Sequence, residues 1–283
     1  METKLLTEKD IDTAAAILRE GGLVGIPTET VYGLGANGLC PEAVARIFTA
    51  KGRPQDNPLI LHIPEAEWLD RYCRNIPPAA YELAERCWPG PLTMVLPRRE
   101  NVPDIVTAGL DTVGVRCPDH PVTLAAIRAA GVPVAAPSGN VSGRPSPTCA
   151  GHMWEDMAGK IDAILDGGPC GVGVESTIID LTAPVPRLLR PGGLPLEELQ
   201  KVLGEVAVDA ALLRPLRAEE RPMAPGMKYR HYAPKAPVTV VTGPGEASAA
   251  YICRRLTPRT GVICFTEYAP LFQSGTVRDI GGE

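Results

Sequence analysis

The sequence predicts an α/β fold in which a twisted mixed sheet is flanked by helices. Short apolar runs alternate with helix-like segments through residues 23–204, and several runs are apolar at consecutive positions. Such runs do not suit a sheet with one face in water, so helices are expected over at least one face. With 283 residues, 45% of them hydrophobic, the chain can bury the core of a large first domain and of a smaller second one.

The strands are predicted from the apolar runs, which are rich in Val, Ile and Leu. They lie at residues 23–27, 58–63, 92–97, 112–117, 132–137, 162–166 and 176–181. Helices are predicted where a proline or an aspartate precedes a helical pattern and a glycine or proline follows it. They lie at residues 41–52, 77–90 and 119–131, with Asp119 as the cap of the third. A further helical pattern ending near Gly204 closes the first domain.

Composition divides the chain into a first domain at 1–205, a linker or lid at 206–237 and a partial C-terminal α/β domain at 238–283. The linker is rich in Pro, Met, Tyr and basic residues and has no helical or strand period. It places Tyr229, His231 and Tyr232 close together. This favours a segment that packs on a functional surface, rather than a passive spacer. After it we expect a strand over 238–242, a glycine turn, a helix and a second strand.

Charge and terminal sequence exclude several classes of protein. A formal net charge of -5 and a pI near 5.5 argue against a protein that coats nucleic acid over its whole surface, although a local basic groove could still bind RNA weakly. The N-terminus lacks the features of a secretion signal, and no apolar run has the length of a membrane span. We therefore expect a cytoplasmic protein without a membrane partner. The eight cysteines show no zinc-ligand spacing, so no metal site is predicted.

Neither of two common glycine-rich nucleotide-binding motifs is found here in its usual context. Residues 33–38, "GLGANG", satisfy G-x-G-x-x-G, but five residues separate the preceding strand from the first glycine and the next helix begins beyond the third. This context does not fit a dinucleotide fold, and we predict a turn. No G-x-x-x-x-G-K-[ST] motif occurs, so an ATP site would have to be built in another way.

Polar loops after the predicted strands carry the candidate binding residues, because ligands of α/β sheets usually bind beyond strand ends. The candidates of these loops are Thr28, Glu29, Thr30, Tyr32, Lys51, Arg53, Asn57, Ser138, Asn140, Ser142, Arg144, Ser146, Thr148, Glu175, Ser176, Thr177 and Arg190. Each loop also fits a plain polar turn. His62, inside a strand, is by itself more typical of a core histidine. Arg116, also inside a strand, must meet a carboxylate, which could belong to Asp111, Asp119 or a substrate.

The loops together offer five cations and many hydroxyl groups, and few candidates for a covalent nucleophile. The cations are Lys51, Arg53, Arg116, Arg144 and Arg190. Such a set suits the binding of a nucleoside triphosphate and a small carboxylate, with catalysis by positioning and charge neutralisation.

At the same stretches the chain closely resembles the YrdC-type threonylcarbamoyl-AMP synthases, in their longer two-domain form. The resemblance is carried, in order, by "PTETVYGLG", "KGRPQDNPL", "GVRCPDH", "APSGNVSG", "VESTIID", "RPGG" and "PGMKYRHYAPKAPV", across residues 10–238. It implies a YrdC-like domain with a positively charged cavity. It also implies an L-threonylcarbamoyladenylate synthase, a nucleotidyltransferase that joins L-threonine, bicarbonate and ATP and releases pyrophosphate.

The resemblance implies a role for each matching position. L-threonine would be held by Thr30, His62, Arg116, Ala136 and Ser176, with Arg116 on the carboxylate. ATP would be held by Arg53, Asn57, Thr112, Ser138, Ser146 and Arg190. Lys51 and Arg53 would act at the phosphates as catalytic residues, and Tyr229, His231 and Tyr232 would belong to a lid. Mg²⁺ would arrive with ATP rather than on a protein carboxylate cluster.

The product of this family feeds the threonylcarbamoyl modification of the adenosine beside the anticodon, so the expected partner is the machinery that transfers the group to tRNA. The second domain of the family is longer than the segment after Pro237, and we expect this chain to be shortened there. Two alternatives remain: a non-catalytic RNA-binding module, and a carbamoyl-adenylate-forming enzyme of the same fold. Chains of the second kind carry acylphosphatase and zinc-finger segments, and neither is found in this sequence.

Overall fold

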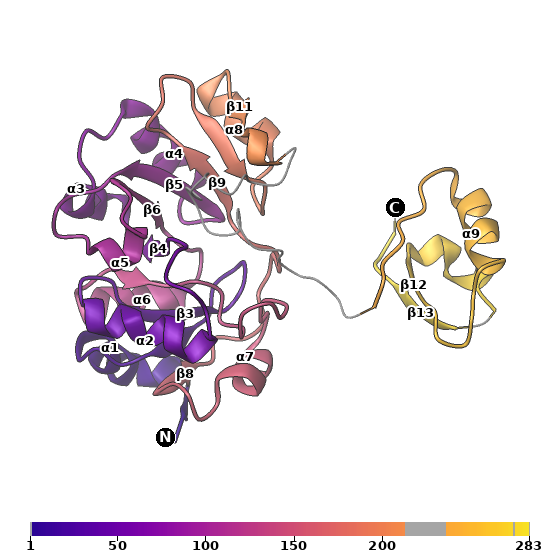
Figure 1. Cartoon of the computed structure of the whole chain (residues 1–283), viewed down its shortest axis with the longest axis horizontal. Helices are drawn as coiled ribbons and strands as arrows, with labels where there is room; N and C mark the ends of the chain where they lie inside the picture. Colours follow the sequence, from indigo (N-terminus) through magenta and orange to yellow (C-terminus); the bar gives the residue numbers. More distant parts are fainter. Residues whose placement is uncertain (1, 213–235, 274, 283) are drawn as a thin grey trace. The chain divides into compact units, whose positions relative to one another are not determined.

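A mixed sheet of eleven strands organises the N-terminal part of the molecule (Figure 1). The computed structural model describes residues 2–212, 236–273 and 275–282, which fall into two units, Met1–Ala233 and Pro234–Glu283. In the described part of the first unit the strand order is β1-β8-β2-β3-β7-β4-β6-β5-β9-β10-β11, with both parallel and antiparallel neighbours. The expected α/β fold with a mixed sheet is confirmed.

The strands follow the apolar runs closely. They are β1 (Lys4–Leu6), β2 (Val24–Ile26), β3 (Gly33–Asn37), β4 (Ile60–His62), β5 (Leu92–Pro97), β6 (Thr112–Arg116), β7 (Val134–Ala135), β8 (Ala163–Leu165), β9 (Thr177–Asp180), β10 (Arg187–Arg190) and β11 (Ala207–Val208). All seven strands predicted in the first domain form, and the central ones, β4 and β5 among them, are buried along nearly their whole length because helices and neighbouring strands enclose them.

The helices pack on this sheet and on each other. They are α1 (Ile11–Arg19), α2 (Pro41–Lys51), α3 (Leu69–Tyr72), α4 (Pro78–Cys87), α5 (Asp104–Thr107), α6 (Pro121–Ala130), α7 (Ala150–Met157) and α8 (Leu196–Leu203), with short 3₁₀ turns η1 (Glu8–Asp10), η2 (Ala66–Trp68) and η3 (Ala210–Leu212). In Figure 1, α1, α2 and α6 gather beside β3 and β8, whereas α4 and α8 lie together near β9 and β11. The predicted Asp119 cap is wrong: His120 is the N-cap of α6, because Pro121 occupies the first turn.

The predicted turn at residues 33–38 is also wrong, since residues 33–37 form β3 between β2 and β7. Glycine is usually disfavoured in strands, and here close packing explains it. A Cβ added to Gly35 would lie 2.8 Å from Val134 Cγ1 and 3.2 Å from the carbonyl oxygen of Val24. The glycines of this segment therefore allow β2, β3 and β7 to pack closely against one another.

We predict that Gly35→Ala lowers the free energy of unfolding by about 1–3 kcal/mol, because the added methyl group overpacks the sheet. Gly151→Ala is the control, since a Cβ there would meet nothing closer than Cys149 Sγ at 3.8 Å. Alanine within α7 should raise stability by up to about 1 kcal/mol. Urea unfolding of the three proteins measures both effects, and equal stability of Gly35→Ala and the parent would contradict the packing explanation.

Residues 206–212 of the predicted linker belong to the first unit, where β11 pairs in parallel with β10. The lid residues Tyr229, His231 and Tyr232 lie outside the described residues.

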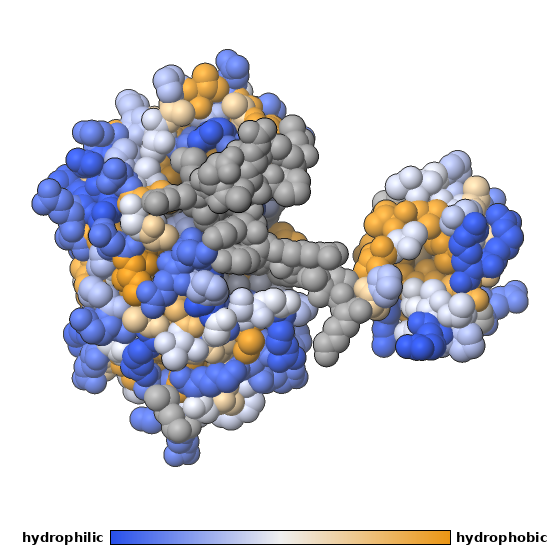
Figure 2. Space-filling view, in the orientation of Figure 1, coloured by the Kyte–Doolittle hydropathy of each residue, from blue (hydrophilic) through white to orange (hydrophobic). Residues whose placement is uncertain are grey.

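The C-terminal unit is a small α/β layer of its own. It contains α9 (Gly245–Cys253), β12 (Gly261–Cys264), η4 (Thr266–Leu271) and β13 (Thr276–Asp279), and β12 pairs in parallel with β13. The strand predicted over 238–242 does not form, because no described segment pairs with it. Val238 and Val240 of this segment are exposed, as is Ile263 of β12, and Figure 2 shows hydrophobic residues on the surface of this unit.

Candidate functional site

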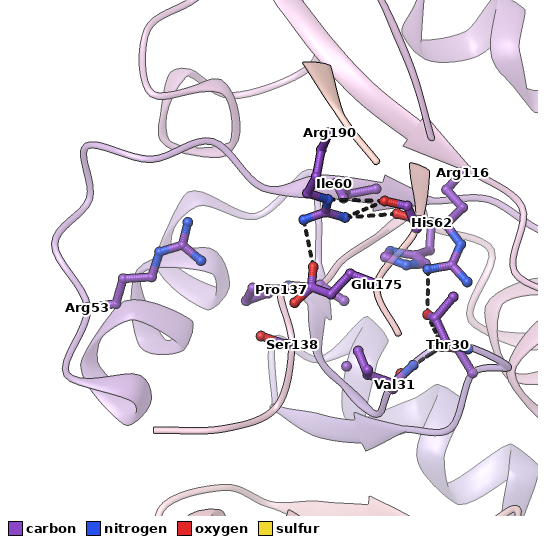
Figure 3. A pocket seen from close by; sticks show the side chains of 14 residues that line it. Thr30, Val31, Arg53, Ile60, His62, Arg116, Pro137, Ser138, Glu175 and Arg190 are labelled. Carbon is purple, nitrogen blue, oxygen red and sulfur yellow. Dashed lines mark hydrogen bonds and ion pairs between the residues drawn. The ribbon is translucent and has the colours of Figure 1, made fainter. Parts of the chain in front are cut away.

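A pocket in the first unit brings together residues from six of the sequence motifs (Figure 3). Its empty volume is about 510 Å³, which includes space open to solvent. It is lined by Thr28, Thr30, Val31, Gly33, Arg53, Ile60, His62, Arg116, Ala136, Pro137, Ser138, Glu175, Ser176 and Arg190. Eight predicted site residues are among them: Thr30, Arg53, His62, Arg116, Ala136, Ser138, Ser176 and Arg190.

The strand pair β4–β6 places two of these side chains next to each other. The strands are parallel, and His62 is the register partner of Arg116, so both side chains leave the same face of the sheet. His62 is buried, and burial followed by the neighbouring Arg116 charge lowers the pKa of its imidazole to about 3. The ring is therefore neutral at physiological pH and can donate or accept a hydrogen bond without adding charge.

Arg116 is held by three protein groups. Its Nη2 forms an ion pair with Glu29 Oε1 at 2.7 Å, its Nη1 donates to Thr30 Oγ1 at 3.0 Å, and its Nε donates to the Gly90 carbonyl at 3.3 Å. The carboxylate that the sequence required is thus Glu29, and neither Asp111 nor Asp119. A guanidinium carries five N–H groups, so about two remain for a ligand carboxylate.

Hydroxyl groups surround the same region. Thr30 Oγ1 lies 2.9 Å from Thr28 Oγ1, and Ser176 Oγ lies 2.8 Å from Thr93 Oγ1. Thr30 and Ser176 are almost completely buried, so their hydroxyl groups are fixed by these bonds and by the adjacent guanidinium groups. This region can orient a small polar molecule that carries a carboxylate.

On the other side of the pocket, Arg190 meets a carboxylate. Arg190 Nη1 lies 2.6 Å from Glu175 Oε2, and its Nε and Nη2 donate to the carbonyl oxygen of Ser176 at 3.1 and 2.8 Å. Ser146, which does not line the pocket, donates its hydroxyl to Glu175 Oε1 at 3.3 Å. The sequence gives Glu175 and Glu29 no role beyond that of loop residues, because ion pairs between distant segments leave no local sequence signal.

Lys51, the last residue of α2, does not line this pocket. Its buried ammonium group donates to the carbonyl oxygens of Ser138 and Asn140, the second at 2.5 Å, and its own carbonyl accepts from the Ser142 amide at 3.0 Å. Burial, and next the charge of Arg53, lower the pKa of the ammonium group to about 7, against the opposing attraction of Glu175 and Asp156. Lys51 thus fastens the 138–142 loop, whose Ser138 lines the pocket.

The remaining predicted nucleotide ligands are spread more widely. Arg53 comes from the loop after α2, and Figure 3 shows it apart from the cluster around Arg190 and Glu175. Asn57 is buried, and neither atom of its amide has a hydrogen-bond partner among the described residues. Thr112 begins β6, about 13 Å of strand away from Arg116, and does not line the pocket.

Two kinds of feature are absent from the part of the chain that the structure describes. No three His, Cys, Asp or Glu side chains within residues 2–212, 236–273 and 275–282 gather where they could hold a metal ion. In the same ranges no helix combines the length and the apolar character that crossing a membrane requires.

Two family models match the chain. The Sua5/YciO/YrdC model, described as "Telomere recombination", matches residues 16–192, and the model of the threonylcarbamoyl-AMP synthase C-terminal domain matches residues 194–280.

Curated relatives and solved structures agree with these matches. A threonylcarbamoyl-AMP synthase of Pyrococcus abyssi is 57% identical over 241 residues, which cover 85% of this chain and 70% of the relative. The Bacillus subtilis threonylcarbamoyl-AMP synthase is 46% identical over 277 residues, or 97% of this chain and 79% of the relative. The crystal structure of P. abyssi Sua5 complexed with L-threonine matches with a TM-score of 0.92 and 48% identity, over all of this chain and 84% of that one. The chain therefore belongs to the Sua5/YrdC family of threonylcarbamoyl-AMP synthases.

Proposed function

We propose that this chain makes L-threonylcarbamoyl-AMP from L-threonine, bicarbonate and ATP, with release of pyrophosphate. The observation that carries the proposal is the pocket itself: it combines three guanidinium groups with a neutral imidazole and fixed hydroxyl groups. This donor set suits an amino acid and a triphosphate side by side. Membership in the synthase family supports the same activity.

L-threonine is proposed to bind on the side of β4 and β6. The matching P. abyssi structure is a complex with L-threonine, which supports a threonine site in this fold. In this chain the carboxylate would meet Arg116, while Thr30, His62 and Ser176 would contact the polar groups of the amino acid, with the backbone at Ala136 beside them. Because all four side chains are buried, the amino acid would react away from bulk water.

ATP is proposed to bind on the side of Arg190, Ser138 and Ser146, with Arg53 reaching the phosphates from its loop and Asn57 offering its unpaired amide. Mg²⁺ would enter as part of the ATP complex, because phosphate oxygens and water supply most of its ligands in such complexes. The cation and the guanidinium groups would neutralise the charge that develops on the leaving pyrophosphate.

The chemistry then depends mainly on proximity. The amine of threonine bonds to the carbon of CO₂ formed from bicarbonate and loses a proton, which gives a carbamate. A carbamate oxygen attacks the α-phosphorus, the bond from that phosphorus to the β-phosphate oxygen breaks, and pyrophosphate leaves. We further propose that the product passes in the cytoplasm to the machinery that transfers the threonylcarbamoyl group to the adenosine beside the anticodon.

The test is pyrophosphate release from Mg²⁺ and ATP, with threonine and bicarbonate each added or withheld. We expect release only when both are present, because neither can form the attacking carbamate alone. Release without threonine would instead favour a plain ATPase, and release that requires carbamoyl phosphate in place of threonine and bicarbonate would favour a carbamoyl-adenylate-forming enzyme. No release, together with RNA binding that weakens steeply with salt, would favour an RNA-binding module.

A further inference from the structure

The nucleotide side of the pocket contains an anion of the protein itself. Glu175 is the one acidic residue among the described pocket-lining residues, and Figure 3 shows its carboxylate directed at the Arg190 guanidinium. One oxygen lies 2.6 Å from Arg190 Nη1, and the other accepts from Ser146 Oγ at 3.3 Å. The side chains of the ion pair are only 14% and 19% exposed. The Arg190 guanidinium and the Ser146 hydroxyl, both expected to bind ATP, therefore already contact the Glu175 carboxylate.

A phosphate group cannot bind at Arg190 Nη1 without disturbing the Arg190–Glu175 ion pair. The other two nitrogens of Arg190 donate to Ser176, so Nη1 is the part of the guanidinium that faces Glu175. A phosphate oxygen at Nη1 would lie close to the carboxylate, and two anions at contact distance in a partly buried site repel strongly. Either the carboxylate withdraws or a cation lies between the two anions.

We propose that the Glu175 carboxylate is an internal anion that occupies the Arg190 subsite until a polyphosphate displaces it, and so selects polyphosphates over single phosphate groups. A single phosphate gains little beyond what the carboxylate already supplies to Arg190 and Ser146. A polyphosphate also reaches other groups of the pocket, Arg53 among them, and can therefore displace the carboxylate. The inference rests on the proposed function in that ATP is taken to be the physiological polyphosphate.

The experiment measures the dissociation constants of inorganic phosphate and inorganic tripolyphosphate by calorimetry, with EDTA present. Three proteins are compared: the parent, Glu175→Gln, and Glu20→Gln as a control with the same loss of charge at an exposed residue outside the pocket. Glu175→Gln should bind phosphate at least about tenfold more tightly than the parent, and its preference for tripolyphosphate should shrink. Glu20→Gln should match the parent.

A double variant, Glu175→Gln with Arg190→Gln, tests whether the gain depends on Arg190. The tighter binding should disappear in it, as expected for two residues that act on the same ligand. If Glu175→Gln melts at a lower temperature than the parent, Glu175→Asp provides a second test, because its shorter carboxylate withdraws from Arg190 while the charge remains. It should also bind phosphate more tightly than the parent, by less than the Gln variant.

Unchanged or weaker binding of phosphate by Glu175→Gln would overturn the proposal. So would a loss of affinity for Mg²⁺-tripolyphosphate in a second titration without EDTA, because that result would make Glu175 a ligand of the cation. These outcomes are separate from the fate of the synthase activity, since the probes are inorganic anions. Tighter phosphate binding in a chain that releases no threonine-dependent pyrophosphate would sustain this inference while the proposed function failed.

Discussion

Replacing Arg116 with alanine is expected to weaken the binding of L-threonine by about 100-fold or more while ATP binding stays within about threefold. Truncating one partner of a buried, hydrogen-bonded charge pair costs about 2–5 kcal/mol, which corresponds to this loss. Arg190 and Ser138 remain in place for the nucleotide. Calorimetric titration of each substrate separately measures the two effects, and an equal loss of both affinities would contradict the placement of the threonine carboxylate on Arg116.

This variant also leaves Glu29 as a buried carboxylate without its ion pair, so its stability should fall by about 3–5 kcal/mol. Arg116→Lys separates stability from binding. Its ammonium group can still pair with Glu29, but it lacks the planar fork that spans Glu29, Thr30 and Gly90 together. We expect thermal melting of Arg116→Lys close to that of the parent, with threonine binding still reduced at least about tenfold.

Lys51→Met is expected to lower kcat/KM for ATP by about 100-fold and to change the dissociation constant of threonine by less than about twofold. Methionine has a similar length and can fill the buried space, but it cannot donate to the carbonyl oxygens of Ser138 and Asn140. Without these charge-assisted bonds the loop should lose the position that the nucleotide requires. Steady-state kinetics with ATP varied measures the first effect, and calorimetric titration of threonine measures the second.

Lys160→Met is the control for this prediction, because Lys160 also donates to a backbone carbonyl, that of Asp156 at 2.8 Å, and does not line the pocket. Its kinetics should match those of the parent. If Lys51→Met impaired threonine binding as much as ATP use, the change would reach beyond the loop, and Lys51 would not act through Ser138.

The fold could be predicted from the sequence where burial determines the pattern. Apolar runs identified the central strands, proline and glycine placed the two ends of α2, and glycine placed the C-terminal end of α6. The prediction failed at β3, because its glycines are selected by the close approach of neighbouring strands, which only the assembled sheet reveals. It also failed at residues 238–242, because no strand among the described residues pairs with this apolar segment.

The site was predictable to a different degree on its two sides. Motif resemblance identified His62 and Arg116, and the sheet register explains why they meet. The partners of the cations could not be predicted: Glu29 and Glu175 reach Arg116 and Arg190 through tertiary contacts. The resemblance placed Lys51 at the phosphates, whereas its described contacts are with a loop, because residue type and spacing do not indicate which way a long side chain turns.

The register of β4 and β6 limits how the pocket can change during evolution. His62 and Arg116 stand on paired strands of the core, where any substitution also disturbs the sheet, whereas Arg53, Ser138 and Ser146 stand on loops that tolerate insertion and reshaping. A descendant of this chain could therefore acquire a new phosphorylated donor through changes in these loops, while Arg190 of β10 stays in place. A new amino acid would demand coordinated replacements in the sheet, so the two halves of the pocket should evolve at different rates.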